Sequence, residues 1–221
     1  VFMGSMINQY PLVTADRNKS ADLLNTTTWS LANRLSFFFD FRGPSIAVNT
    51  ACSSSLSAIY MACESIQRGE CEVAVAGGVN LNLHPSKWTG LSKNGMISAG
   101  NESKSMGQGD GYLPGEGVGT ILIKPLKQAE ADKDHIYGVV KGGFMNHGGR
   151  SAGFTVPTGE GQKTLTAGVL AAANMSADQI DYIESASNGS PVGDPVEMNN
   201  LIAAFANVKK KVAVGTVKSN I

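Results

Sequence analysis

The stretch Val48-Asn49-Thr50-Ala51-Cys52-Ser53-Ser54-Ser55-Leu56 organises the predicted fold and carries a candidate nucleophile. Residues 45–50 are typical of a strand, and the apolar spacing that follows predicts a helix over about 53–68, with Gly69 as its C-cap. Cys52 then lies on a strand-to-helix turn, near the positive end of the helix dipole, where the pKa of a thiol is lowered. Its small neighbours leave room for a ligand and for close backbone approach. The alternative is a buried cysteine that packs as a small hydrophobe.

The composition is that of an ordinary globular protein, with 221 residues, of which 42% are hydrophobic and 26 are glycines that predict many tight turns. Lys+Arg and Asp+Glu both number 18, so the formal net charge is zero. There is no basic run that would favour nucleic acid or a membrane surface as a partner. We find no signal peptide and no apolar run of membrane-spanning length. Both ends of the sequence resemble cuts within a larger protein.

The three cysteines, Cys52, Cys63 and Cys71, do not have a metal-binding spacing, and an odd number cannot all pair within one chain. Free thiols indicate a reducing compartment, so we expect a cytoplasmic location. Cys63 lies on the same predicted helical stripe as Cys52 and is expected in the core.

The rest of the pattern alternates apolar strands with amphipathic helices and predicts an α/β fold. Around the cysteine stretch we expect an apolar run at 2–7, a polar connection at 8–28, a helix from Trp29 to Phe39, a buried parallel strand at 73–79, functional loops at 80–117 and a strand at 118–123. A second series is a strand at 136–144, a helix at 161–174, a capping signal at 176–179, a strand at 180–184, a helix at 195–206 and a buried strand at 211–217. This order indicates two similar halves, the first over 1–126 and the second, incomplete, over 127–221.

The glycines between Gly107 and Gly119 superficially resemble a phosphate-binding loop. Such a loop follows a strand and opens a helix, and neither is predicted here. We therefore do not favour a nucleotide site.

A reactive cysteine needs a basic partner and an oxyanion site. Of the three histidines, His84 follows a strand, His135 is at a surface position, and His147 alone has the small, turn-forming neighbours of a site loop. A turn histidine satisfied by backbone is an equally good interpretation of His147. Backbone N–H groups at Cys52 and its successors are candidates for an oxyanion hole.

The Gly/Ser/Pro loop between Glu184 and Glu197 is the other candidate site, because it joins a strand to a helix. Asp194 and Glu197 are expected in the first turn of that helix, and we favour a capping role for both over catalysis. Residues 185–193 contain no side chain that titrates near neutral pH.

Residues Asn49–Leu56 resemble the active-site motif of β-ketoacyl synthase domains, the condensing enzymes of polyketide and fatty-acid synthesis. The resemblance extends over 111–119, 193–197 and 218–221 and covers nearly the whole chain. The run Pro-Gly-Glu-Gly-Val-Gly and the run Asn146-His147-Gly148-Gly149 are similar to ketosynthases of modular polyketide synthases whose acyltransferases act in trans.

This resemblance implies a thiolase-like fold with two related α/β halves in a layered α-β-α-β-α architecture. It also implies a homodimer, with the strand that leads to Cys52 at the interface. In the family the cysteine accepts an acyl group from an acyl carrier protein, and two histidines promote decarboxylation of a malonyl unit on a second carrier. Lys218 would support this site. No cofactor or metal would be bound directly, since the carrier's phosphopantetheine arm brings the substrate. Carrier domains and neighbouring polyketide synthase domains are the expected partners.

One loop departs from the family pattern. Condensing members read His-Gly-Thr-Gly-Thr where this chain reads Ala186-Ser187-Asn188-Gly189-Ser190, so Ala186 occupies the position of the first catalytic histidine. The second histidine would follow Ile221, and residues 101–106 lack the usual Phe-containing pattern of the gating loop. A methyl group cannot donate a hydrogen bond to a developing oxyanion, and losing one such donor costs about 2.7–4 kcal/mol.

We therefore expect a non-elongating ketosynthase domain that moves an acyl chain between carriers without extending it. Two alternatives stay open. One is a competent condensing enzyme in which His147 or a water network replaces the histidine. The other is a catalytically silent domain that supports the synthase dimer or docks carriers.

Overall fold

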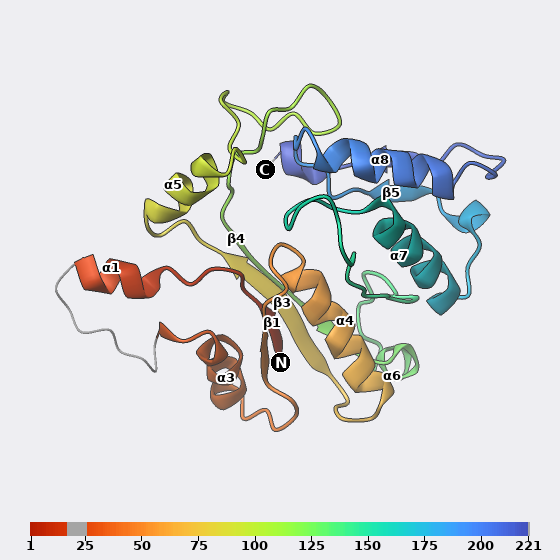
Figure 1. Ribbon diagram of the computed structural model, residues 1–221. Helices are drawn as coiled ribbons and strands as arrows, with labels where there is room; N and C mark the ends of the chain where they lie inside the picture. The colour runs from red at the N-terminus through yellow and green to blue at the C-terminus, as the bar shows by residue number, and fades with distance from the viewer. Residues whose placement is uncertain (17–25, 221) are drawn as a thin grey trace. The chain divides into compact units, whose positions relative to one another are not determined.

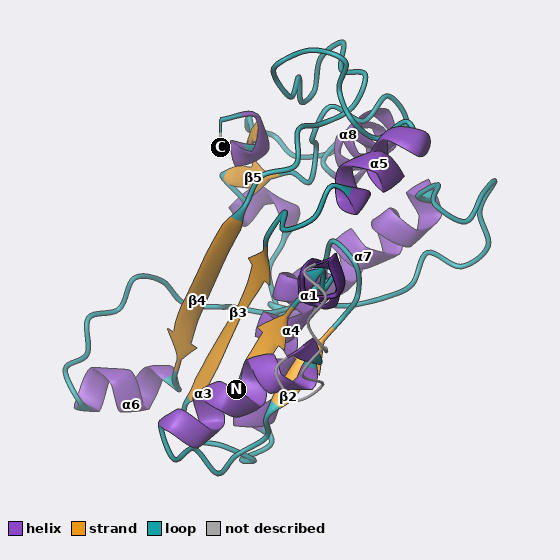
Figure 2. Cartoon of the chain, turned by 90° about the vertical axis from the view of Figure 1, so that its left-hand side faces the viewer, coloured by secondary structure: helices purple, strands orange, loops and turns teal. Residues whose placement is uncertain are grey.

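A four-stranded mixed sheet, in the order β2-β1-β3-β4, forms the centre of the first part of the computed structural model. Its strands are β1 (Phe2–Gly4), β2 (Ile46–Val48), β3 (Ala74–Asn80) and β4 (Gly117–Ile123). Strand β1 pairs in parallel with β2 and β3, whereas β3 pairs antiparallel with β4. Figure 2 shows β3 and β4 running side by side in opposite directions. Residues 73–79 were predicted to form a parallel strand. That prediction is correct for the pairing of β3 with β1 and wrong for its pairing with β4.

The structure describes residues 1–16 and 26–220, which divide into two units. Unit 1 comprises the described residues of 1–85 and 115–139, and unit 2 comprises those of 86–114 and 140–221. Residues 17–25 of the expected polar connection, and Ile221, lie outside the described residues.

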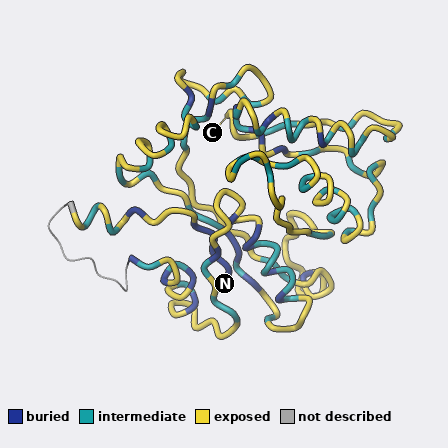
Figure 3. Tube along the Cα trace, viewed as in Figure 1, coloured by how far each residue is buried: buried dark blue, intermediate teal, exposed yellow. Residues whose placement is uncertain are grey.

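Helix α4 (Ser54–Gln67) packs against β1 and β3 and closes the core of unit 1 (Figure 1). The core side chains are small on α4 and β3 and larger on β1 and β2. They are Ala58, Ala62, Ala74, Ala76, Phe2 and Val48. Figure 3 shows buried segments along these elements, and shorter buried segments elsewhere on the trace. Gly69 closes the helix as predicted, with φ of 72° and the next backbone N–H bonded to the Ser65 carbonyl at 3.0 Å.

Close backbone contact fixes the N-terminal end of α4 on the sheet. A Cβ at Gly4 would lie 2.6 Å from the carbonyl carbon of Ser54, and one at Gly78 would lie 2.0 Å from Ser55 Oγ. The expectation that small residues around Cys52 permit close backbone approach is confirmed at Gly4 and Gly78.

The other helices of unit 1 are α1 (Tyr10–Asp16), α3 (Trp29–Phe38) and α6 (Leu126–Ala131). Helix α3 follows the prediction for 29–39 closely. Helix α1 was missed inside the expected polar connection, because its seven residues carry too little apolar periodicity to distinguish a short helix from a loop.

Unit 2 contains two packed helices, α7 (Gly159–Ala172) and α8 (Gly193–Ala204), and a short parallel pair, β5 (Tyr182–Glu184) and β6 (Ala213–Gly215). It also contains α5 (Ser86–Lys93) and two single 3-10 turns, η1 (Ala177–Gln179) and η2 (Val217–Ser219). The predicted helices at 161–174 and 195–206 are confirmed within a few residues. The capping signal is confirmed too, since Gln179 Oε1 accepts the Ser176 N–H at 2.9 Å.

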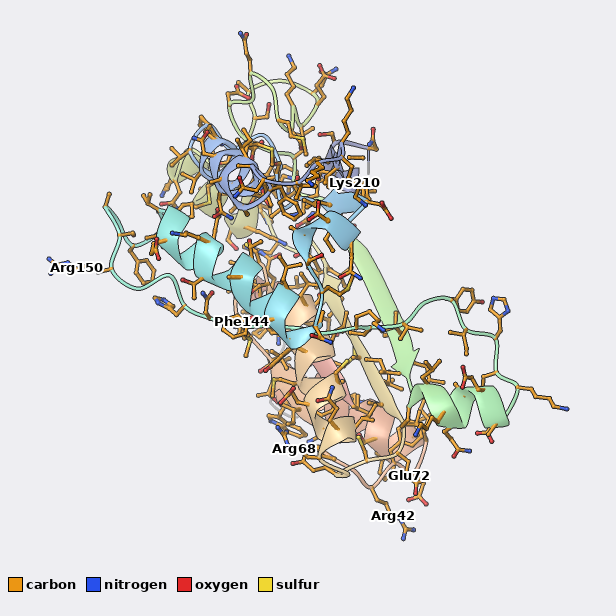
Figure 4. All side chains as sticks on the ribbon, turned by 90° about the vertical axis from the view of Figure 1, so that its right-hand side faces the viewer. Arg42, Arg68, Glu72, Phe144, Arg150 and Lys210 are labelled. Atoms are coloured by element: carbon orange, nitrogen blue, oxygen red, sulfur yellow. The ribbon has the colours of Figure 1, made fainter. Side chains whose placement is uncertain are left out.

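Three further expectations were wrong. Residues 80–117 include helix α5, and β6 is largely exposed rather than buried. Residues 136–144 form no strand with any described residue, because alternation of apolar side chains makes a strand only where a partner edge exists. Phe144 instead packs on α7, where its ring lies 2.6 Å from the position a Cβ would take at Gly168 (Figure 4).

Across residues 1–16 and 26–220, every helix is too short or too polar to cross a membrane.

Candidate functional site

Cys52 lies in unit 1 on the turn that connects the end of β2 at Val48 to the start of α4 at Ser54. The residue before it, Ala51, has φ of 55°, a left-handed conformation that is uncommon for any residue with a side chain. Strain of this kind is frequent at sites where a side chain must be displayed. The Cys52 side chain is exposed, so the alternative of a buried, inert thiol is wrong.

Hydroxyl groups brace this turn. The Thr50 N–H donates to Ser54 Oγ at 3.0 Å, and Ser54 Oγ donates to the Ala51 carbonyl at 2.6 Å. Thr50 Oγ1 and Ser57 Oγ share a hydrogen bond of 2.8 Å, and Ser53 Oγ donates to the Thr50 carbonyl at 2.8 Å. The serines therefore stabilise the turn that displays the thiol, in addition to being small.

The other two cysteines have different surroundings. Cys63, on the same helix, is half-buried, and this burial, followed by the negative charge of Glu64, raises the pKa of its thiol. Cys71 Sγ lies 3.5 Å from Ser65 Oγ and packs against the core of unit 1. Neither thiol resembles an exposed nucleophile.

The loop that departs from the family pattern lies in unit 2, between β5 and α8. Ala186 is exposed, whereas its neighbours Ser185 and Ser187 are 3% and 1% exposed. The Ala186 N–H donates to Glu197 Oε1 at 2.8 Å, and Lys218 Nζ donates to the Ala186 carbonyl at 2.9 Å. The backbone of Ala186, where the resemblance expects a histidine, is thus held at both its N–H and its carbonyl, and the residue is exposed.

Asp194, which is 7% exposed, lies in the first turn of α8 but does not cap it. Its carboxylate accepts backbone N–H groups from Asn188 at 3.1 Å, from Gly189 at 3.0 Å and from Met106 at 3.0 Å. The capping interpretation was wrong for both Asp194 and Glu197, because their hydrogen bonds go to neighbouring segments rather than to the N–H groups of their own helix.

The segment 101–111 packs on the same loop. A Cβ at Gly109 would lie 2.6 Å from the Cα of Gly189, and the Gly111 N–H donates to the Gly189 carbonyl at 3.1 Å. The Ser105 N–H donates to Ser219 Oγ at 3.1 Å. Three segments that are far apart in the sequence therefore form one hydrogen-bonded assembly in unit 2.

Two contributors to this assembly were not predicted. Glu184 Oε1 accepts the Val217 N–H at 2.6 Å, and Glu184 also accepts the Tyr182 hydroxyl. The Tyr182 hydroxyl, and then the Val217 N–H, lower the pKa of Glu184. Ser187 Oγ donates to Glu197 Oε2 at 3.2 Å. Of these contacts, the sequence could have indicated only the one made by Ser187. The resemblance predicts glycine at this position, so a serine there adds a hydroxyl group that can form a hydrogen bond.

Each of the three histidines has a contact of its own. The carbonyl of His84 accepts Gln9 Nε2 at 3.0 Å, and the His135 ring lies edge-on to Tyr137 at 4.5 Å. His147 Nδ1 accepts the Gly149 N–H at 2.9 Å, which is the contact expected of a turn histidine. Within the residues that the structure describes, no three His, Cys, Asp or Glu side chains gather closely enough to hold a metal ion.

The structure brings Ala186, Asp194, Glu197 and Lys218 together in unit 2, and it places Cys52 on its own turn in unit 1. In the first group the backbone of residue 186 is held in place, and its alanine side chain cannot donate a proton or a hydrogen bond. The second offers an exposed thiol at the N-terminal end of a 14-residue helix.

Two family descriptions match the chain. That of the Beta-ketoacyl synthase, N-terminal domain matches residues 1–129, and that of the Beta-ketoacyl synthase, C-terminal domain matches residues 137–221.

Curated relatives match along the whole chain. Polyketide synthase PksL of Bacillus subtilis (strain 168) is 45% identical over 228 residues, and polyketide synthase ThaG of Burkholderia thailandensis is 42% identical over 228 residues. Both alignments cover 100% of this chain but only 5% of PksL and 4% of ThaG. The chain thus spans a small part of these relatives.

Solved structures also align with the whole chain. The oxazolomycin ketosynthase domain OzmH KS7 of Streptomyces albus has a TM-score of 0.92 at 42% identity, and 40% of its chain is covered. The ketosynthase from module 6 of the bacillaene synthase of Bacillus subtilis 168 has a TM-score of 0.91 at 33% identity, with 39% of its chain covered.

Proposed function

Because the chain belongs to the beta-ketoacyl synthase family, we propose that it is a non-elongating ketosynthase domain of a polyketide synthase. Cys52 accepts an acyl chain from an acyl carrier protein and passes it on without decarboxylative condensation. The polyketide synthase context is supported by the names of the relatives and of the aligned ketosynthase domains. We infer that this synthase is one whose acyltransferases act in trans, because the Pro-Gly-Glu-Gly-Val-Gly run and the Asn146-His147-Gly148-Gly149 run resemble ketosynthases of that kind.

The observation that carries this proposal is an exposed alanine at position 186, on a backbone held at both its N–H and its carbonyl. A malonyl thioester that loses carbon dioxide builds negative charge on its carbonyl oxygen. The family's histidine would donate a hydrogen bond there, and alanine cannot. Loss of one such donor slows the step by about 10²- to 10³-fold.

Acyl transfer makes a smaller demand on the protein. The Cys52 thiolate attacks the thioester carbonyl of the incoming chain, the carrier's pantetheine thiol leaves with a proton, and the reverse exchange releases the chain to the next carrier. This needs an accessible thiol and N–H donors near the helix terminus. The exposed Cys52, two residues before the first residue of α4, supports this step.

Two competing functions have less support. A competent condensing enzyme would need a substitute for the lost histidine, and His147 Nδ1 already accepts a backbone N–H. A silent structural domain would have no need to display a thiol on a strained turn, as Cys52 is displayed after Ala51.

The proposal also covers the fold, the oligomeric state, the role of Lys218 and the partners of the domain. We infer a thiolase-like fold with halves at 1–126 and 127–221 in a layered architecture, and a homodimer that uses β2, an edge strand of its sheet. Lys218 supports the site through its bond to the Ala186 carbonyl. The acyl chain arrives on a phosphopantetheine arm, with no cofactor bound directly, and carrier domains and neighbouring synthase domains are the partners.

Intact mass spectrometry of the full-length protein tests the loading step. Incubation with an acyl-carrier thioester is expected to add one acyl group, and Cys52→Ala is expected to abolish the addition. Cys71→Ala is the matched control and should load like the parent. Failure of the parent to acylate would favour a silent domain.

A further inference from the structure

Asn49 follows the last residue of β2, and its side chain makes two hydrogen bonds. Asn49 Oδ1 accepts the Ala51 N–H at 3.1 Å, and Asn49 Nδ2 donates to the Met6 carbonyl at 3.2 Å. A carboxamide has one acceptor end and one donor end, so only one of its two orientations makes both bonds. The side chain therefore connects the turn that carries Cys52 to the segment that follows β1.

The backbone of Ala51 is held on both sides. Its φ of 55° is left-handed, a conformation that a residue with a Cβ avoids unless its surroundings enforce it. Asn49 holds the Ala51 N–H, and Ser54 holds the Ala51 carbonyl through its N–H at 3.1 Å and its Oγ at 2.6 Å. Because a peptide group is planar, the held carbonyl also fixes the direction of the Cys52 N–H. These bonds thus set the backbone from which the thiol projects.

The segment that follows β1 is itself attached to the loop after β3. Gln9, which is 3% exposed, donates through Nε2 to the His84 carbonyl at 3.0 Å and accepts the Leu83 N–H through Oε1 at 3.1 Å. Met6 lies between Gln9 and the end of β1, so the chain is restrained on both sides of it. Its carbonyl is therefore a fixed acceptor for the Asn49 amide.

We propose that Asn49 is a positioning residue for acyl transfer, which keeps Ala51 in the left-handed conformation that presents Cys52 to a thioester. This inference rests on the proposed function. In the transfer, the Cys52 sulfur gives up its proton and bonds to the thioester carbonyl carbon. The bond from that carbon to the pantetheine sulfur breaks, and the leaving sulfur takes up a proton. Attack on a carbonyl carbon depends on the direction of approach, so a displaced turn slows this step even while the thiol stays exposed.

The experiment follows acylation of the full-length protein by butyryl-pantetheine at several concentrations. Asn49→Leu keeps the size of the side chain and removes both bonds, and it should lower the rate constant at saturation by about 10- to 100-fold. The half-saturating concentration should stay close to that of the parent. Asn49→Asp keeps an acceptor for the Ala51 N–H and should recover most of the parent rate. Asn33→Leu, which changes an exposed asparagine of α3, is the matched control and should acylate normally.

Two further measurements separate positioning from loss of the fold. Iodoacetamide needs only an exposed thiol, so its reaction with Cys52 should be unchanged in Asn49→Leu. Glycine adopts the left-handed conformation at no steric cost, so adding Ala51→Gly to Asn49→Leu should return most of the lost rate. Thermal unfolding identifies a variant that does not fold, and Asn49→Ala then replaces Asn49→Leu.

Acylation of Asn49→Leu at the parent rate would overturn the proposal. Equal losses in the Leu and Asp variants would also overturn it, and so would a parallel loss of iodoacetamide reactivity or no recovery with Ala51→Gly. If the parent itself is not acylated while its Cys52 still reacts with iodoacetamide, the proposed function is refuted instead.

Discussion

Lys218 Nζ donates a hydrogen bond to the backbone carbonyl of Ala186 at 2.9 Å, and so joins the turn after β6 to the loop after β5. Both partners are exposed, which limits the contribution of this bond to stability.

Lys218→Met is therefore expected to change the free energy of unfolding by no more than about 1 kcal/mol. Because the loop loses one of its restraints, the Ala186 amide should exchange its hydrogen for deuterium roughly fivefold faster than in the parent, the change that about 1 kcal/mol of local stability gives. Hydrogen–deuterium exchange with peptide mass mapping measures this. Lys163→Met, which changes an exposed lysine of α7, is the control and should leave that exchange unchanged. Exchange at the parent rate in Lys218→Met would show that Lys218 does not hold the loop.

The three thiols should separate by reactivity. Cys52 is exposed, whereas Cys63 is half-buried with a raised pKa. Iodoacetamide at pH 7 is expected to label Cys52 well before Cys63, as peptide mass mapping would record.

The raised pKa of Cys63 also sets the sign of a stability effect. A thiol whose folded pKa lies above its unfolded value stabilises the fold below the unfolded pKa of about 8.5, and this contribution is lost as pH rises through the folded pKa. Cys63→Ala should therefore show less alkaline loss of stability than the parent. Labelling of Cys63 as fast as Cys52 at pH 7 would contradict the burial described for it.

Gly4 is a position in unit 1 where a single added methyl group should meet the backbone of α4. A Cβ there would lie 2.6 Å from the Ser54 carbonyl carbon and 2.7 Å from the Ser55 nitrogen, and neither backbone atom can rotate away. Gly4→Ala should lower the free energy of unfolding by about 1–3 kcal/mol or more. Gly119→Ala, in β4, meets no atom within 4 Å and should stay within about 0.5 kcal/mol of the parent. Urea unfolding compares the two, and equal midpoints would show that the turn does not rest on Gly4.

Acid should act on unit 2 through Glu184. The Tyr182 hydroxyl, and next the Val217 N–H, lower the pKa of this carboxyl. A depressed folded pKa means that the contribution is present above the ordinary glutamate value of about 4.3 and is lost as pH falls through the folded value. Tyr182→Phe should move the onset of acid loss to higher pH. Melting temperatures between pH 3 and pH 7 would reveal that shift, and identical profiles would argue against it.

Local signals were sufficient to predict the strand, the turn and the helix around Cys52. The apolar run ends in β2, the 3.6-residue spacing gives α4, and Gly69 adopts the positive φ that closes it. Short elements such as α1 and α5 were missed, because a stretch of seven or eight residues holds too few periodic positions. The strand predicted at 136–144 is absent for a different reason. Apolar residues there favour a strand, but a strand forms only beside a partner strand, and the local sequence does not show whether one is present.

The candidate site was predictable in its residues but not in its contacts. Asp194 lies in the first turn of α8 as predicted, whereas Glu197 lies beyond that turn, and the predicted capping partners within the helix were wrong for both. In the structure, backbone N–H groups of the loop 186–190 donate to these two carboxylates instead. The N–H of Met106, from a distant segment of the sequence, also donates to Asp194. Such contacts depend on the tertiary path of the chain, which no local pattern contains.

The central claim is that the chain moves an acyl group without extending it, and the mass of the acyl chain on the receiving carrier tests this most directly. The full-length protein would be loaded at Cys52 and then offered equal amounts of a free-thiol carrier and a malonyl-carrier. The expected product is the free-thiol carrier bearing the original acyl group, with the malonyl-carrier unchanged. A β-ketoacyl chain two carbons longer, formed on the malonyl-carrier with release of carbon dioxide, would contradict the account.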